Sequence, residues 1–306
     1  MLPALRERDH KFVAGFKRLK FAGFAEPHSL ELDLGEWDNT RPLRLLMYGF
    51  TEYFSANSMY AAYQAGIQVK APYLEALDTD GRWVRVIDDL GFPAGLPRTM
   101  VADLTGHLPA GTRRVRIVTN LQIYWDQILI DSTPDDSSVR VAEVPLAHAG
   151  LRFHGYPKSV EKHFPGELDY LYDQVSATGP YVRHLGSYTR YGDVLPLLQQ
   201  VDDKFAIFGS GEELMLEFDP AKLPAVAPGW KRDYFFYANG FVKDMDFYEA
   251  HALTVAPLPF HAMPDYPNSD ARPYPQDEPS INYQLDYNTR FQSGSGITSF
   301  RFHFPE

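Results

Sequence analysis

Alternation between apolar and polar positions is the clearest pattern in the first half of the chain. In Arg114–Ile117 each polar residue is followed by an apolar one, which is typical of a β-strand with one face in water. Leu121–Ile130 is almost continuously apolar, as expected of a central strand in a β-sandwich that also presents polar groups at an edge. The segment Gly91–Asp131 is therefore expected to supply the central strands of the fold.

The same pattern predicts further strands on either side of that segment. Together with the strands inside Gly91–Asp131, they make about eight short strands at roughly ten-residue spacing. This number and spacing suggest a jelly-roll sandwich. They are Ser29–Leu34, Leu43–Phe50, a hairpin formed by Ile67–Leu77 and Trp83–Ile87, Met100–Leu104, Val115–Thr119, Leu121–Asp131 and Val139–Pro145. One short helix is predicted within Asn57–Gly66, with Asn57 as its N-cap.

The second half of the chain has a less regular pattern. Residues 147–204 are rich in Tyr and His without clean periodicity, and only a short helical pattern begins at Asp193. Residues 257–279 contain seven prolines and are expected to run extended over a surface. Six further strands are predicted, at Phe205–Phe208, Leu214–Phe218, Tyr234–Tyr237, Ala252–Ala256, Tyr283–Tyr287 and Ile297–Phe304.

These elements predict an all-β fold: a jelly-roll, galactose-binding-like β-sandwich with a second packed β-unit and a few short helices. The expected organisation is an N-terminal arm (1–28), the jelly-roll sandwich (29–146), an aromatic-rich connecting region (147–204) and a second β-unit (205–306) with the Pro-rich segment 257–279. A chain of 306 residues is long enough for two such units.

Composition supports this fold and limits the function. Aromatic residues make up 14% of the chain, and 24 Pro with 22 Gly indicate many turns. The formal net charge of −11 argues against nucleic acid or an anionic membrane surface as partner. No window is apolar enough for membrane insertion, and Met1–Lys20 does not have the pattern of a signal peptide. The chain contains no cysteine, which excludes disulfides and thiolate chemistry and leaves the compartment open.

Motifs for common catalytic chemistry are absent. The sequence has no G-x-G-x-x-G, P-loop, H-E-x-x-H or G-x-S-x-G pattern. Nucleotide binding, zincin chemistry and α/β-hydrolase chemistry therefore have no support, and we expect no certain cofactor.

Several residues are candidates for ligand binding. Tyr124 and Trp125 could stack on the apolar face of a sugar while Asp126 accepts hydrogen bonds from its hydroxyls. The alternative is that Trp125 fills the sandwich core and Asp126 satisfies a buried donor. Four further candidates mix ionisable groups with aromatics in segments expected to be loops, namely His154, Tyr156, Arg232 and Asp233.

Asp244, Asp246 and Glu249 form a possible metal site. They bring several oxygen donors within a few residues, and Ca²⁺ prefers six to eight oxygen ligands. The alternative is a solvated acidic turn after a strand. Calcium is thus a possible cofactor on the sequence alone.

Two segments carry a resemblance to a known group of proteins. Gly91–Asp131, with NLQIYWDQILID at 120–131, and PGWKRDYFFYANGFVKDMDFY at 228–248 resemble the C-terminal β-region of bacterial FG-GAP and ASPIC/UnbV repeat proteins, which are relatives of cartilage acidic protein. The resemblance implies an extracytoplasmic or secreted role in binding and supplies no catalytic residues. The D-x-D-x-D-G calcium loops of those repeats are absent here. The layout from Leu30 to Asp131 also looks like the galactose-binding-like jelly roll that many carbohydrate-binding modules use.

These observations lead to three hypotheses. The preferred one is a non-catalytic binding or interaction module for a carbohydrate or protein ligand, most simply a carbohydrate, within a larger surface or secreted assembly. The second is a glycan-acting hydrolase that uses paired carboxylates about 5–10 Å apart. The third is a purely structural module.

Overall fold

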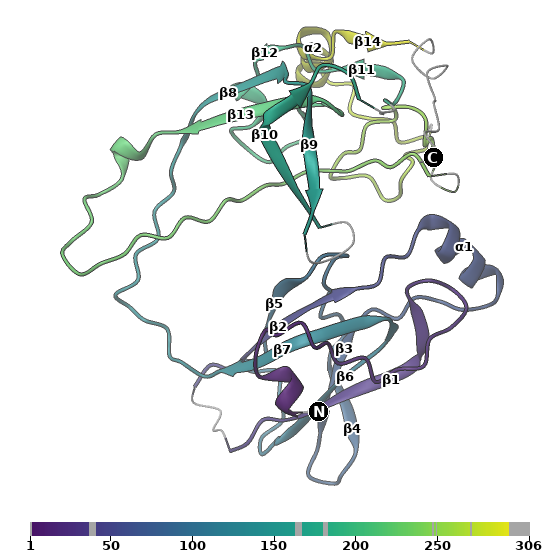
Figure 1. Ribbon diagram of the computed structural model, residues 1–306, viewed down its shortest axis with the longest axis vertical. Helices are drawn as coiled ribbons and strands as arrows, with labels where there is room; N and C mark the ends of the chain where they lie inside the picture. Colours follow the sequence, from purple (N-terminus) through teal and green to yellow (C-terminus); the bar gives the residue numbers. More distant parts are fainter. Residues whose placement is uncertain are drawn as a thin grey trace. The chain divides into compact units, whose positions relative to one another are not determined.

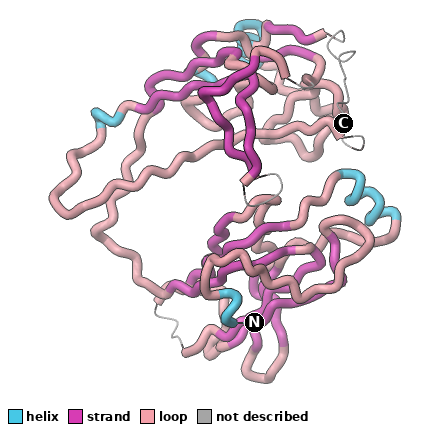
Figure 2. Tube along the Cα trace, viewed as in Figure 1, coloured by secondary structure: helices cyan, strands magenta, loops and turns pink. Residues whose placement is uncertain are grey.

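The computed structural model describes residues 2–36, 41–162, 167–179, 183–246, 248, 250–269 and 271–293. This part of the chain is mostly β, with 14 strands and two short α-helices, and all strand pairs are antiparallel. The all-β fold predicted from the sequence is confirmed. The chain divides near Val139 into two compact units. Figures 1 and 2 show the strands of both units.

The first unit is a sandwich of two antiparallel sheets. One sheet has the strand order β1-β6-β3-β4 and the other has the order β5-β2-β7. The strands are β1 (Phe24–Asp33), β2 (Arg44–Thr51), β3 (Tyr73–Leu77), β4 (Trp83–Ile87), β5 (Arg98–Asp103), β6 (Arg114–Leu121) and β7 (Ile123–Asp131). Every other residue of β2 is buried, because successive side chains of a strand point to opposite faces of its sheet.

A single apolar core fills the space between these two sheets. It takes Met47 from β2, Leu74 from β3, Ile117 from β6 and Trp125 from β7, all of them at most 5% exposed. The chain passes from the first sheet to the second at Gln122, between β6 and β7. The buried side-chain amide of Gln122 donates to the carbonyl of Phe24 at 2.7 Å. This polar group is therefore hydrogen-bonded at the point where the chain changes from one sheet to the other.

The N-terminal residues lie along the outer edge of β7. Val13 forms an antiparallel bridge with Trp125, and its N–H donates to the Trp125 carbonyl at 2.7 Å. The short 3₁₀-helix η1 (Leu2–Leu5) brings Leu5 into the core. The predicted arm thus covers a strand edge, although β1 already begins at Phe24.

The short helix and the hairpin of the first unit are confirmed, with one correction. Helix α1 spans Ala56–Gln64, and β3 pairs with β4 across the turn at Gly81. The N-cap of α1 is Ser55 and not Asn57, since the Ser55 hydroxyl accepts from the Ser58 N–H at 3.3 Å.

The predicted strand at Val139–Pro145 does not form. These residues are irregular, and the next strand starts at Leu146. The side chains of Val139 and Val141 are exposed, so the alternating apolar residues of this segment do not form the buried face of a strand. Seven strands lie in the described part of the first unit.

The described part of the second unit contains three small sheets. Their strand orders are β12-β8-β13, β10-β9 and β11-β14. The elements are β8 (Leu146–Phe153), β9 (Tyr156–Glu161), β10 (Leu168–Ser176), β11 (Gly186–Tyr188), β12 (Gly192–Asp193), η2 (Leu195–Leu197), β13 (Glu212–Phe218), η3 (Pro220–Lys222), α2 (Glu278–Tyr287) and β14 (Arg290–Gln292). Residues of β8, of the segment around η2, of the Pro-rich segment and of α2 share a small core that includes Leu151, Val194, Phe260 and Tyr283.

Tyr283–Tyr287, predicted as a strand, is helical. The Asp277 carboxylate caps α2 by accepting from the Ser280 N–H at 2.9 Å. Tyr283 and Tyr287 then lie one turn apart, with ring centroids 6.4 Å from each other. Tyr283 is 3% exposed, and burial raises its pKa to about 12. A cap and one buried helix face thus override the strand preference of the aromatic residues.

Three more predicted strands are irregular: Phe205–Phe208, Tyr234–Tyr237 and Ala252–Ala256. In the first of these, two side chains supply most of the hydrogen bonds, beside one backbone bond from the Thr189 N–H to the Ile207 carbonyl at 3.0 Å. The Tyr283 hydroxyl bonds both the N–H and the carbonyl of Phe205, and the Thr189 hydroxyl accepts from the Ile207 N–H at 2.7 Å. Leu214–Phe218 is confirmed as β13, and the pattern after Asp193 forms only η2. The predicted strand Ile297–Phe304 lies outside the described residues.

Candidate functional site

Tyr124, Trp125 and Asp126 lie together on β7, and all three are buried. Their exposed fractions are 8%, 5% and 0%. Trp125 belongs to the sandwich core, and the Tyr124 ring stacks on Phe50 with centroids 4.8 Å apart. The Asp126 carboxylate accepts the N–H groups of Asp9 and His10, each at 3.3 Å. These side chains hold the N-terminal arm against the sandwich and do not present an open stacking surface.

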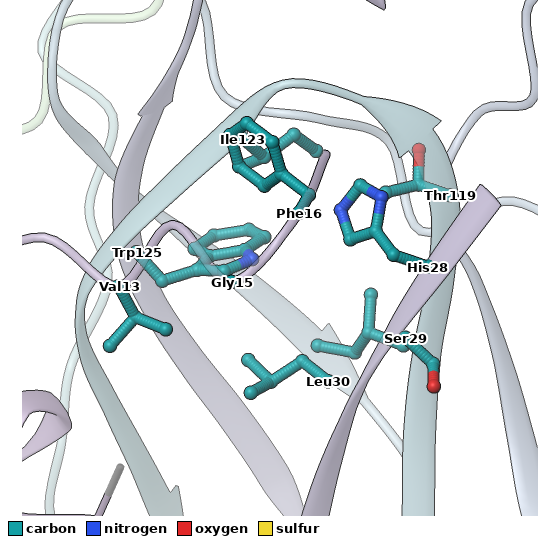
Figure 3. A pocket seen from close by; sticks show the side chains of 10 residues that line it. Val13, Gly15, Phe16, His28, Ser29, Leu30, Thr119, Ile123 and Trp125 are labelled. Atoms are coloured by element: carbon teal, nitrogen blue, oxygen red, sulfur yellow. The ribbon is translucent and has the colours of Figure 1, made fainter. Parts of the chain in front are cut away.

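A small cavity lies beside Trp125, between the arm and the sandwich. Figure 3 shows the rings of Trp125 and His28 on opposite sides of it. Burial, partly offset by the hydrogen bond to the Glu26 carbonyl, lowers the pKa of His28 below its ordinary value. The cavity measures about 50 Å³. Small-molecule sites usually measure about 300 Å³ or more, so this cavity is too small for a sugar ring.

His154 and Tyr156 lie at the turn between β8 and β9 in the second unit. His154 Nδ1 is 3.5 Å from Glu213 Oε2, and the Tyr156 ring packs edge-on against Phe153 at 6.0 Å. A side chain at Gly211 would meet the Tyr156 ring at 2.8 Å, so glycine is required for this packing. Both candidates therefore take part in local packing around β8 and β9.

Arg232 and Asp233 lie in an exposed irregular segment of the same unit. The Arg232 guanidinium donates to the Pro224 carbonyl. The contact of Arg232 described above is to Pro224, and those of His154 and Tyr156 are to Glu213, Tyr172 and Phe153. The four loop candidates therefore do not form one site in the described structure.

The acidic residues proposed for calcium are only partly described. The Asp246 carboxylate accepts the Tyr248 N–H at 3.1 Å, and Glu249 lies outside the described residues. Within the described ranges, no group of three or more His, Asp or Glu side chains is arranged to hold a metal ion. The calcium site proposed at Asp244, Asp246 and Glu249 thus stays a prediction.

A larger hollow, which the sequence did not point to, lies at the end of the β3–β4 hairpin. It measures about 310 Å³ and is lined by Lys70, Ala71, Tyr73, Arg85, Asp88 and Asp89. The Arg85 guanidinium lies 3.6 Å from the centroid of the Tyr73 ring and 3.7 Å from the Asp88 carboxylate. The hollow thus combines two cations, two carboxylates and one aromatic ring.

Buried hydrogen bonds hold one rim of this hollow in place. Asn120, at the end of β6 and only 4% exposed, accepts the Lys70 N–H and donates to the Gln68 carbonyl, both at 2.8 Å. The Thr119 hydroxyl donates to the Lys70 carbonyl at 2.8 Å. On the other rim the Asp89 carboxylate accepts the Gly91 N–H at 2.7 Å. The Leu90 N–H donates to the Pro72 carbonyl at 2.8 Å and joins this rim to the residues before β3. Both rims are therefore held in place, as a site needs in order to bind without large ordering costs.

Local sequence could have indicated only part of this hollow. Asp88 and Asp89 directly follow a predicted strand, and Arg85 lies within that strand. Tyr73 joins them only because β3 pairs with β4, and Lys70 only because Asn120 fixes the backbone before β3.

The strongest electrostatic cluster of the second unit surrounds Glu212, whose side chain is fully buried. The Arg290 guanidinium binds both carboxylate oxygens, at 2.6 and 3.1 Å, and Tyr191 and the Gly209 N–H each donate at 2.9 Å. Arg183 lies 3.6 Å away. A carboxylate offers about four lone-pair positions, and all are used here. Glu212 is therefore an anchor that joins β13 to β14, with no free position for a substrate.

Comparisons with protein-family models, with curated proteins and with solved structures found no match to this chain. In the part of the chain that the structure describes, no helix has the length and apolar character needed to cross a bilayer.

Proposed function

We propose that this protein is a non-catalytic carbohydrate-binding module and that the hollow at the β3–β4 hairpin is its ligand site. The observation that carries the proposal is a hollow of about 310 Å³ that gathers Lys70, Arg85, Asp88 and Asp89 around Tyr73. Its volume is at the lower end of the range for small-molecule sites.

The chemistry of this lining suits a polyol. Each sugar hydroxyl both donates and accepts a hydrogen bond, so a sugar needs acceptors and donors close together. Asp88 and Asp89 supply acceptors, while Lys70 and Arg85 supply donors. The Tyr73 ring with its stacked guanidinium offers a flat surface to the C–H face of a sugar. Because the two signs of charge balance, the hollow favours a neutral ligand over an ion.

The layout of the first unit and the resemblance of two segments extend the proposal. Two antiparallel sheets around one core are consistent with the jelly-roll arrangement of galactose-binding-like modules. The resemblance of Gly91–Asp131 and of 228–248 to the ASPIC/UnbV-associated region supports a place in a larger surface or secreted assembly. Both points are part of the proposal, and binding can be tested without them.

A glycan array followed by calorimetry on the purified chain tests the proposed site. We expect a neutral glycan to bind, and the substitutions Arg85→Ala and Asp88→Asn to weaken binding about tenfold or more, since each removes a hydrogen bond with a charged group. The matched control is Arg82→Ala in the same hairpin, whose guanidinium lies 4.0 Å from the exposed Asp80.

Three results would argue against the proposal. An empty array contradicts carbohydrate binding. Binding that is unchanged in Arg85→Ala and Asp88→Asn places the ligand elsewhere on the molecule. Release of shortened glycans from the bound substrate would favour the hydrolase alternative instead.

A further inference from the structure

The segment from Trp230 to Val242 in the second unit exposes a long run of apolar side chains. Phe235 is 95% exposed, Tyr237 78% and Val242 82%. Tyr234 and Phe236 are also exposed, and Figure 2 shows this stretch as loop throughout. Folded proteins rarely expose this many large apolar side chains within one short segment, and exposed apolar surface of this kind usually marks a binding surface.

The backbone of this segment is open as well. No backbone group of residues 231–242 is hydrogen-bonded to another backbone group of the described chain. A chain segment whose N–H and carbonyl groups are not paired with the described backbone is a template to which another strand can add. The four consecutive aromatic residues Tyr234–Tyr237 have the composition of a strand, as the sequence predicted.

Contacts in its middle and near its C-terminal end hold the segment near the rest of its unit. The Phe236 ring packs against Phe218 at 6.1 Å, and the Phe241 ring lies 5.4 Å from Tyr266. Lys243 Nζ donates to the Ala256 carbonyl at 3.2 Å. The segment is therefore fixed in position while the outer sides of its rings stay uncovered.

The described chain reaches Ser293 close to this place. Gln292 of β14 pairs with Gly186, and the adjacent Leu185 bridges to Thr254. Thr254 is two residues from Ala256, the acceptor of the Lys243 ammonium. Residues 294–306 follow Ser293, and 13 extended residues can span roughly 40 Å. They can therefore reach the exposed aromatic segment.

The sequence of these residues matches the surface. Phe300, Phe302 and Phe304 alternate with Arg301 and His303, which is the pattern of a strand with one apolar face. We propose that residues 297–304 add as a β-strand to the segment 231–242 and place the three Phe rings on its exposed aromatic side chains.

The chain's own segment is favoured over a second copy as the occupant. A formal net charge of −11 opposes association of two copies. A segment tethered through a few residues has an effective concentration in the millimolar range and needs no such association.

Amide hydrogen exchange of the intact chain tests the proposal. We expect amides in 233–242 to exchange at least a hundredfold more slowly than in an unstructured peptide, independently of protein concentration. The combined substitution Phe300→Ser, Phe302→Ser and Phe304→Ser should remove this protection. The matched control is Arg301→Ser with His303→Ser, on the other face of the same strand, which should retain it. Unprotected amides in the unaltered chain, or protection that survives loss of the three Phe rings, would overturn the proposal.

The absence of cysteine from the chain allows a second measurement. A thiol introduced as Phe302→Cys should react with an alkylating reagent at least tenfold more slowly than one introduced as Arg301→Cys. Equal rates would contradict a strand with one buried face. Protection that appears only together with a dimeric mass would assign the surface to a second copy and overturn the proposal.

Discussion

The two units of this chain are stabilised in different ways. In the first, two sheets of four and three strands enclose one core of 15 buried apolar residues. In the described part of the second, the sheets have only two or three strands and the core has seven such residues, three of them aromatic. There, polar side chains such as Glu212 and Tyr283 join distant segments. The first unit thus has the larger apolar core, whereas in the second such long-range polar contacts accompany a small core.

The largest effect is expected from a substitution that disrupts the packing of the first unit. Trp125→Ala removes a ring that fills the sandwich core and contacts the arm, and we expect a loss of about 3–5 kcal/mol in the stability of that unit. Hydrogen exchange followed peptide by peptide during denaturation measures each unit separately. Trp83→Ala, at a partly exposed position on β4, is the control and should cost less. Equal destabilisation of both units would show that they do not unfold separately.

The next largest effect is expected from a substitution that removes the Glu212 anchor of the second unit. Glu212→Gln removes the negative charge that the Arg290 guanidinium binds and that Arg183 faces, and we expect a loss of about 3 kcal/mol in that unit alone. Glu213→Gln is the neighbouring control on β13, because Glu213 pairs with the exposed Arg152 and such pairs contribute at most about 1 kcal/mol. A Glu212 variant as stable as the unaltered chain would contradict the anchor.

The same anchor predicts a dependence on pH. Burial raises the pKa of Glu212, but the hydrogen bonds from Arg290, the Gly209 N–H and Tyr191 outweigh it and leave the pKa below its ordinary value of 4.5. A carboxylate with a lowered pKa stabilises the folded state above pH 4.5, and this stabilisation is lost as the pH falls through the folded-state value. Denaturation between pH 7 and pH 3 should therefore show an acid-dependent loss that Glu212→Gln lacks.

The smallest effect is expected from a substitution that removes a polar anchor from the first unit, and it sharpens the comparison of the two units. Asn120→Ala breaks the two hydrogen bonds that fix Gln68 and Lys70, and we expect a loss of about 2 kcal/mol. Glycan affinity should fall as well, since Lys70 would no longer be held at the rim of the hollow. Asn57→Ala, at an exposed position of α1, should change stability by no more than about 0.5 kcal/mol.

The sequence predicted the first unit better than the second for a physical reason. Strands such as β1 and β6 bury one face, so their apolar residues alternate and can be recognised locally. Tyr283–Tyr287 is also rich in strand-favouring residues, yet the cap at Asp277 and the burial of Tyr283 make it helical. Phe205–Phe208 depends on Tyr283, 78 residues away along the chain. Local periodicity carries no information about such partners.

The candidate site shows the same limit. The sequence left open whether Trp125 stacks on a ligand or fills the core, and its position between the sheets makes it part of the core. Tyr73 and Arg85 meet only through the pairing of β3 with β4. Types of residue could be recognised in advance, whereas the hollow that they form depends on strand pairing.

The arm beside β7 has a practical consequence for dissecting this protein. Since Val13 pairs with Trp125, and Asp126 accepts two backbone N–H groups of the arm, the arm completes the sheet as an interchangeable strand would. A truncated chain that starts at residue 20 should then accept a synthetic peptide of residues 4–18 in trans. Such fragment complementation, read out as recovered solubility and Trp125 fluorescence, would convert the folding of the sandwich into a bimolecular association that can be titrated.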